Sequence, residues 1–246
     1  MGQYYRIVNV DRRQQLVPYD FDNGAKLMEW SYNRNHRVLA LMNLLAGPWK
    51  GERVYVVGDY ADLSDPAEPC HEPLKKVLRE LCTEDLYSYA ADHYTQICDT
   101  FSGRSDRGNE TYQLIPDITK DEGYRYIYNH ATKQVIDLEK CPIEWTWYDA
   151  SHDKAFVTKV APLPLLLAMG NGRGGGDYHD AFEGYMLVGS WCDSSQYISV
   201  TSQPLADTED YEEFAPDFTE QRPAIPWNEE AYEIEKCEKA GRKAGA

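Results

Sequence analysis

The sequence predicts an α+β fold with a mixed or antiparallel sheet, helices and a pseudo-duplicated core of two related halves. Strand-like alternation and helical periodicity both occur, but not in the regular β-α-β order of a doubly wound protein. A self-similarity gives the second observation: Gly2-Gln3-Tyr4-Tyr5-Arg6-Ile7-Val8-Asn9 returns as Gly123-Tyr124-Arg125-Tyr126-Ile127-Tyr128-Asn129. With 246 residues and 42% hydrophobic side chains, the chain can bury a substantial core.

Further matches extend the repeat. Arg13-Gln14-Gln15-Leu16 matches Lys133-Gln134-Val135-Ile136, Met28-Glu29-Trp30-Ser31 matches Ile143-Glu144-Trp145-Thr146, and Pro48-Trp49 matches Ser190-Trp191. Each copy is then one supersecondary unit that buries its apolar face against the other, with the matched tryptophans as core anchors.

This pattern divides the chain into four parts that together form one compact domain. They are a first repeat unit over 1–62, a helix-rich connection and loop over 63–122, a second repeat unit with a glycine-rich insertion over 123–203, and an acidic tail with a terminal helix over 204–246.

The first unit combines a hairpin, a helix and a strand. Residues 4–10 alternate and are rich in aromatic and β-branched side chains, so they predict a strand that pairs with 14–17. From Ala25 the pattern is helical in two pieces. Asn35 has the chemistry of an N-cap and Gly47-Pro48 that of a stop, so the apolar run between them predicts a buried central helix. Residues 53–58 predict the closing strand.

Leucine and valine recur at helical spacing after Pro73, which predicts one or two helices within 70–98, followed by a loop over 101–110. The rest of the chain predicts strands near 124–129, 133–138, 154–160, 184–189 and 196–201, a short apolar helix over 163–169, and a terminal helix over 228–243.

The charge balance excludes some classes of partner. A formal net charge of −16 opposes direct binding to a nucleic-acid backbone or an anionic membrane. The excess is concentrated in an acidic block over 206–214, which interleaves acids with aromatic residues. This block suits a basic protein partner, and the simpler interpretation is a solvated linker.

No stretch approaches the roughly 20 apolar residues that span a bilayer, and the first residues do not form a signal peptide. We therefore expect a soluble, cytoplasmic protein. Its six cysteines are scattered without a Cys-x-x-Cys pair, which favours thiols over disulfides or a metal site.

Several short patterns are similar to those of a family of uncharacterised bacterial and phage proteins. They are Gly2-Gln3-Tyr4-Tyr5 with Val8-Asn9, Lys26-Leu27-Met28-Glu29-Trp30, Trp49-Lys50-Gly51-Glu52-Arg53-Val54 with Gly58-Asp59-Tyr60, and Gly172-Arg173-Gly174-Gly175-Gly176-Asp177 with Trp191. The resemblance covers most of the chain outside its helix-rich middle and acidic tail. It implies a phage or prophage setting, with defence or counter-defence as the expected role. It does not imply any particular activity.

The glycine-rich insertion is one candidate ligand-binding site. Its backbone N–H groups can converge on an anion beside Arg173, although the run matches neither a P-loop nor a dinucleotide fingerprint. Asp177, His179 and Asp180 are ligand types that suit a divalent metal or general-base chemistry, and His130 was a candidate to approach them. The sequence predicts no particular cofactor. A divalent metal is the cofactor that these residue types would suit. A flexible surface loop is the simpler interpretation.

The second candidate is a partner-binding surface. It comprises the acids Asp207, Glu209, Asp210, Glu212 and Glu213 together with Trp147 and Trp227, which lie outside the repeat. Because no catalytic signature occurs, the sequence favours a protein that binds a basic partner surface, such as the nucleic-acid channel of a nuclease, as a phage-encoded inhibitor of a host protein. The alternative is a small-molecule or nucleotide-binding protein, or a metal-dependent enzyme, that uses the Gly172–Asp180 loop with the acids around Asp59.

Overall fold

The chain was analysed as a computed structural model, which describes residues 3–21, 24–64, 66, 69–99, 111–141, 144–149, 154–170, 187–216 and 218. Within these ranges helices and mixed sheets confirm the α+β class. The helices are α1 (Leu27–Trp30), α2 (His36–Ala46), α3 (His71–Leu81), α4 (Leu86–His93) and α5 (Pro162–Leu166), with 3-10 turns at Pro18–Phe21 and Cys192–Tyr197.

The larger sheet has six strands in the order β10-β3-β1-β2-β4-β5. Their bounds are Ala168–Met169, Val54–Gly58, Tyr5–Asn9, Gln14–Leu16, Thr95–Cys98 and Tyr112–Leu114. β1 is antiparallel to both β2 and β3, whereas β10 joins β3 in parallel, and β4 joins β2 in parallel.

The smaller sheet has four strands in the order β11-β6-β7-β12, with bounds Ile198–Thr201, Tyr126–Asn129, Gln134–Asp137 and Glu212–Glu213. Two further strands, β8 (Glu144–Asp149) and β9 (Lys154–Lys159), form an antiparallel hairpin.

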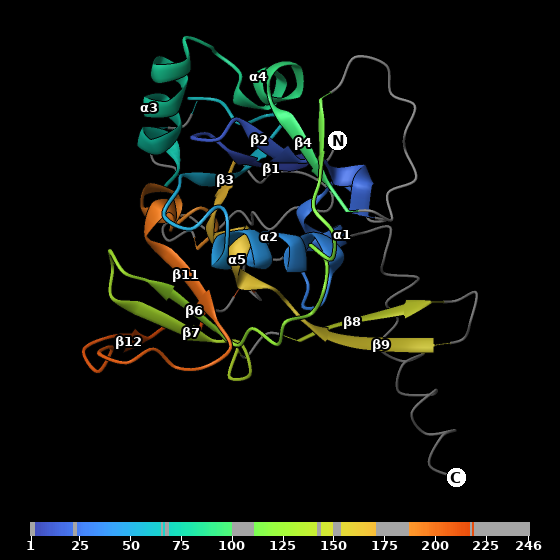
Figure 1. Ribbon diagram of the computed structural model, residues 1–246, viewed down its shortest axis with the longest axis vertical. Helices are drawn as coiled ribbons and strands as arrows, with labels where there is room; N and C mark the ends of the chain where they lie inside the picture. Colours follow the sequence, from blue (N-terminus) through green and yellow to red (C-terminus); the bar gives the residue numbers. More distant parts are fainter. Residues whose placement is uncertain are drawn as a thin grey trace.

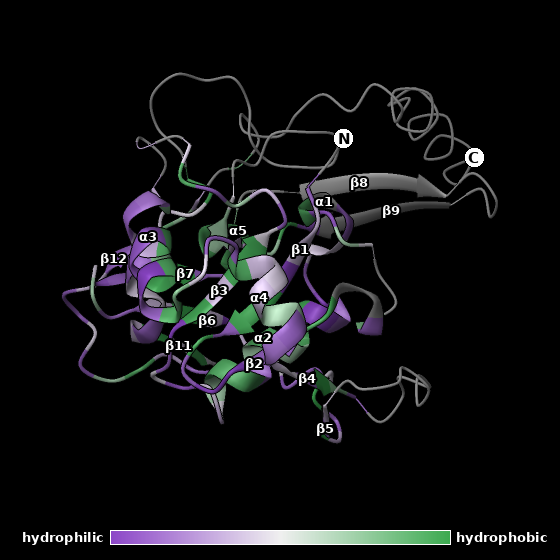
Figure 2. Ribbon diagram, turned by 90° about the horizontal axis from the view of Figure 1, so that it is seen from above, coloured by the Kyte–Doolittle hydropathy of each residue, from purple (hydrophilic) through white to green (hydrophobic). Residues whose placement is uncertain are grey.

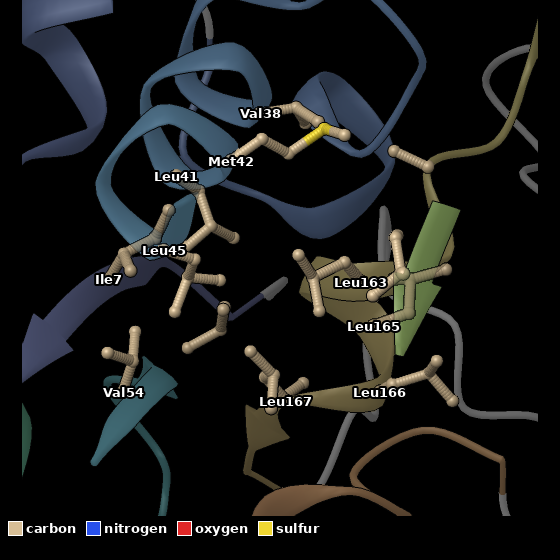
Figure 3. Close-up of a cluster of buried hydrophobic side chains, with 14 of the residues drawn as sticks. Ile7, Val38, Leu41, Met42, Leu45, Val54, Leu163, Leu165, Leu166 and Leu167 are labelled. Atoms are coloured by element: carbon tan, nitrogen blue, oxygen red, sulfur yellow. The ribbon is translucent and has the colours of Figure 1, made fainter. Parts of the chain in front are cut away.

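The main core lies between the two sheets, where α2 and α5 form a shared layer (Figure 1). The inner face of the larger sheet contributes Ile7 and Val54, and that of the smaller sheet contributes Ile127 and Val200. Figure 3 shows α2 and α5 directing leucines toward one another and toward β1 and β3. Burying each such side chain contributes about 1.5–3 kcal/mol, so this layer is the main source of stability.

Helix α2 forms where the sequence predicts it. The Asn35 side chain accepts a hydrogen bond from the Arg37 backbone N–H at 2.9 Å, and Gly47 follows the last turn. The helix buries residues around its whole circumference, including Leu41 and Leu45, which fits its position between two sheets.

A second apolar cluster covers the other face of the larger sheet. Val8 and Tyr55 on the sheet meet Leu74 and Val77 of α3 and Leu86 of α4. Figure 2 shows α3 with both hydrophobic and hydrophilic residues, as expected for a helix with one face on a sheet and the other in water. The described part therefore stacks as helices, sheet, helices, sheet.

The two hairpins that open the predicted repeat units make matching contacts. Ile7 pairs with Leu16 in the first, and Ile127 pairs with Ile136 in the second. Arg13 and Lys133 both have φ of 53° at the end of the turn. In each hairpin the turn closes on an asparagine side chain, that of Asn9 or Asn129.

The tryptophans after the central helices match in the same way. The indole N–H of Trp49 donates to Gln14 Oε1 at 2.7 Å, and that of Trp191 donates to Gln134 Oε1 at 3.0 Å. Trp30 and Trp145 do not match, because Trp30 ends α1 whereas Trp145 lies in strand β8. That two related halves make up the core stays a prediction.

Other sequence expectations differ from the structure. Residues 95–98, expected within a helix, form β4, because β2 and β5 pair with this segment. Residues 187–189, expected in a strand, form a turn, and the apolar run after Pro162 ends as a helix at Leu166 and continues as β10. The predicted loop over 101–110 and the terminal helix over 228–243 lie outside the described residues.

The amino-terminal residues pack where two parallel strands end. β10 and β3 run in parallel with Met169 opposite Val57, so Gly170 and Gly58 lie at the same edge. The fully buried Gln3 side chain fills the space beside both glycines. A Cβ at Gly58 would lie 2.4 Å from Gln3 Cδ, and one at Gly170 would lie 2.6 Å from Gln3 Oε1.

Two findings bear on the expected class of protein. No helix in the described ranges has the length and apolar character needed to cross a bilayer. The five cysteines that these ranges include form no disulfide with one another.

The Trp49 contact predicts a stability difference. Replacing Gln14 by Ala leaves the buried indole N–H without its acceptor, so we expect the free energy of unfolding to fall by about 1–3 kcal/mol in urea titrations. The control is Gln113→Ala, which removes only the exposed contact between Gln14 and Gln113. This control should change the free energy by less than about 0.5 kcal/mol. Equal costs for the two variants would contradict the structural role of the Trp49 hydrogen bond.

The Gln3 contact predicts a coupling between two positions. Gly58→Ala should destabilise the protein by about 1–3 kcal/mol, because the new methyl group collides with the Gln3 amide. In the double variant with Gln3→Ala, the cost should be smaller than the sum of the two single costs by about 0.5–3 kcal/mol in a urea-based double-mutant cycle. Strict additivity would show that the two residues do not touch.

Candidate functional site

The acidic block folds onto the smaller sheet. Glu212 and Glu213 form β12, which lies parallel to β7 with Glu212 opposite Gln134 (Figure 1). The Glu212 backbone N–H donates to the Lys133 carbonyl at 2.8 Å, and the Phe214 N–H donates to the Val135 carbonyl at 2.8 Å. The solvated-linker interpretation is therefore wrong for this segment, because its backbone is paired with the sheet.

Aromatic residues on the outer face of the sheet hold the segment in place. Tyr126, Tyr128 and His130 occupy alternate positions along β6 and just after it. The ring centroids of Tyr126 and Tyr128 lie 6.4 Å apart, and those of Tyr128 and His130 lie 6.1 Å apart. The Tyr128 hydroxyl accepts a hydrogen bond from the Leu205 backbone N–H at 3.0 Å. Tyr211 stands edge-on to His130 and Tyr128, with its hydroxyl 2.7 Å from His130 Nδ1.

His130 therefore contacts Tyr211 of the acidic block, whereas the cluster of Asp177, His179 and Asp180 that it is predicted to approach lies outside the described residues. Its Nε2 contacts the Ser199 hydroxyl, while Nδ1 faces Tyr211. Partial burial, and to a lesser extent the nearby Lys50, lower the pKa of His130. The imidazole is consequently neutral at pH 7 and can link the two hydroxyls as one donor and one acceptor.

The carboxylates of the block differ in their surroundings. Lys133 pairs with Asp210, and the hydrogen bond between them lowers the pKa of Asp210. Lys140 pairs with Glu213 at 2.5 Å. The remaining three, Asp207, Glu209 and Glu212, are exposed and make no ion pair with a cation in the described ranges.

We call the five carboxylates Asp207, Glu209, Asp210, Glu212 and Glu213 the acidic edge. β12 is the last strand in the order of its sheet, so its outer side pairs with no described strand. The acidic edge thus combines negative charge and an open backbone edge on a folded support.

The structure says less about the two tryptophans that were predicted to contact a partner. Trp147 lies in β8, where its backbone is opposite Phe156 of β9. Trp227 lies outside the described residues, as do the four ligand-binding candidates Arg173, Asp177, His179 and Asp180. Within the described ranges no three His, Cys, Asp or Glu side chains are grouped so as to hold a metal ion.

The structure does place the start of the glycine-rich insertion. Gly170 lies at the edge where β10 and β3 end, beside Gln3 and Gly58. Asp59 follows Gly58 directly, and its Oδ1 accepts a hydrogen bond from the Tyr4 backbone N–H at 2.9 Å. Residues 3–4 and 58–59, which belong to two of the short sequence patterns, therefore meet at one edge of the larger sheet.

Sequence reasoning identified the acids of the edge from their density but missed the residues that support them. His130 and Tyr211 are separated by 81 positions, and their contact arises only when the chain returns to the sheet. The signal that the sequence offers is weak: alternating aromatic residues on the outer positions of a strand, with a further tyrosine inside the acidic block.

Comparison of the chain with protein-family models, with curated proteins and with solved structures gave no significant match. The function of this protein therefore has to follow from its own geometry and charge.

Proposed function

We propose that this protein acts by binding another protein through the acidic edge, and that the partner presents a basic surface. The observation that carries the proposal is that the acidic block is attached to the sheet through the two-residue strand β12 while three of its carboxylates face water without a described cation. A solvated linker would not require the backbone pairing and aromatic contacts that fix this segment.

The chemistry of the edge favours a protein partner over other classes. A net charge of −16 opposes nucleic acid and anionic lipid, whereas complementary charge speeds and orients encounter with a basic protein. A cluster of exposed negative groups also suits the basic channel that a nuclease uses for its substrate. With the resemblance to phage proteins, this supports a phage-encoded inhibitor of a host nuclease or defence protein as the specific form of the proposal.

The test compares two variants that lose the same number of charges. The edge variant carries Asp207→Asn, Glu209→Gln and Glu212→Gln. The control variant carries Glu84→Gln, Asp92→Asn and Asp117→Asn, exposed acids on other elements. The immobilised wild-type protein should capture a stoichiometric partner from bacterial lysate at low salt and less of it at about 0.15 M salt. The edge variant should bind the purified partner about tenfold more weakly, since each exposed charge contributes roughly 0.2–1 kcal/mol.

The control variant should bind the purified partner within twofold of the wild type. Equal losses in the two variants would show a dependence on net charge only, and no loss in the edge variant would remove the acidic edge from the proposal. For the nuclease form, duplex DNA should displace the protein from its partner. Simultaneous binding of DNA and the protein would contradict that form.

A second function is favoured by the edge at which Gln3, Gly58 and Gly170 meet. Ligands of open sheets often bind outside the carboxyl ends of parallel strands, and both β3 and β10 end here. The glycine-rich segment follows Gly170 in the sequence, and Asp59 follows Gly58 at the same edge. These features support a small-molecule or nucleotide-binding protein in which Arg173, Asp177 and His179 contact the ligand.

This alternative makes a separate prediction. In a thermal-shift screen with nucleoside mono-, di- and triphosphates, a binding nucleotide should raise the melting temperature of the wild type. Replacing Arg173, Asp177 and His179 by Ala should abolish that increase while leaving the melting temperature of the free protein nearly unchanged. The edge variant, as the matched control, should keep the full increase. Unchanged nucleotide binding after the three replacements would remove the glycine-rich segment from consideration.

A further inference from the structure

A pocket lies at the seam between the two predicted repeat units. It has a volume of about 480 Å³ and is lined from α2, from the segment before β6, from the end of β7 and from Lys159 at the end of β9. This volume falls within the range of roughly 300–1,000 Å³ that is usual for small-molecule sites. Neither the acidic edge nor the Gly58–Gly170 edge contributes a residue to it.

The floor of the pocket is apolar. Val38, Leu39 and Met42 come from successive turns of α2, and Leu138 comes from the residue after β7. Figure 3 shows Val38 and Met42 on the side of α2 that faces away from β1 and β3. A ligand that enters the pocket can therefore place a hydrophobic body against this floor.

The rim of the pocket carries three cations and two acids. Arg34, Arg125 and Lys159 line it together with Asp121 and Glu139. Arg125 is already engaged, since Asp137 accepts from its Nε and Nη2, and Glu139 lies 2.6 Å from its Nη1. Asp121 pairs with Arg34, so each acid of the rim has a cation beside it, and Arg34 and Lys159 determine what the pocket can accept.

Arg34 and Lys159 are held close together and keep donors to spare. The Asn33 backbone N–H donates to the Lys159 carbonyl at 2.9 Å, so the chains that carry the two cations run side by side. Arg34 is 85% exposed, and its ion pair with Asp121 uses only Nε, at 3.3 Å. Lys159 Nζ donates to the Glu139 carbonyl at 2.6 Å and has two further N–H groups.

We propose that this pocket binds a small organic carboxylate, with its apolar body on the α2 floor and its carboxylate between Arg34 and Lys159. A guanidinium and an ammonium with free N–H donors form short, charge-assisted hydrogen bonds to a carboxylate. The apolar floor selects against small inorganic anions, which have no body to bury. An organic cation of the same shape would meet only acids that already have a cation partner, Asp121 beside Arg34 and Glu139 beside Arg125.

Isothermal titration with three eight-carbon probes tests the proposal. Octanoate, octan-1-ol and octylammonium have the same apolar chain and differ in charge. Octanoate should bind saturably with one site, octan-1-ol at least tenfold more weakly, and octylammonium not at all. In the double variant Arg34→Gln, Lys159→Gln, octanoate should bind no more tightly than octan-1-ol.

Two further variants keep the test decisive. Ser202→Trp places a large side chain at an exposed position of the lining and should abolish binding of all three probes. The control Arg12→Gln, Lys76→Gln removes two cations outside the pocket and should leave octanoate affinity within twofold. Equal affinity for octanoate and octylammonium, a preference for octanoate that survives the double variant, or no saturable binding at millimolar octanoate would each overturn the proposal.

Discussion

The structure depends on one apolar layer, that of α2 and α5, because both sheets bury their inner faces against it. The larger sheet has a second cover in α3 and α4. For the smaller sheet, the inner residues Ile127, Ile136 and Ile198 belong to the same core cluster as this shared layer. A sheet of three or four strands needs such a cover to be stable, so the smaller sheet, and with it the acidic edge, exists only while the layer is intact.

The same constraint explains why matching tryptophan contacts occur twice. Trp49 lies between α2 and β3, and Trp191 lies before the 3-10 turn that leads into β11, so each tryptophan precedes a strand next to the hairpin. Each ring is buried, and a buried indole N–H usually finds an acceptor. Gln14 and Gln134 supply it from the equivalent position of each hairpin. The same packing requirement therefore accounts for both tryptophan–glutamine contacts, whether or not the two halves have a common origin.

Capping residues and hydrophobic periodicity are enough to predict the elements that depend mainly on interactions between neighbouring residues. The Asn35 cap, the apolar run after it and the alternating hairpins predict α2, β1 and β2 close to their observed bounds. β4 was not predictable in this way, because the four-residue segment Thr95–Cys98 is too short to show a strand period and only long-range pairing with β2 and β5 makes it a strand. The Glu-Glu pair of β12 has poor strand propensity, and only tertiary contacts make it a strand.

The candidate sites, too, are predictable from the sequence only where they depend on neighbouring residues. Composition was enough to indicate the acids of the edge, but not the support from His130 and Tyr211. The pocket beside α2 has no sequence signature at all, since Arg34 and Lys159 are 125 positions apart and meet only through the backbone contact between Asn33 and Lys159.

The two ion pairs of the acidic edge are too exposed to hold it in place. Lys133 and Asp210 are each more than half exposed, and such pairs contribute little to stability. Backbone pairing with β7 and the Tyr211 contacts supply the attachment, while the two lysines reduce the mutual repulsion of five neighbouring carboxylates. Complete neutralisation would have favoured the fold further. That Asp207, Glu209 and Glu212 remain exposed in the described structure without a cation means that the fold tolerates repulsion here, which is the condition a basic partner would relieve.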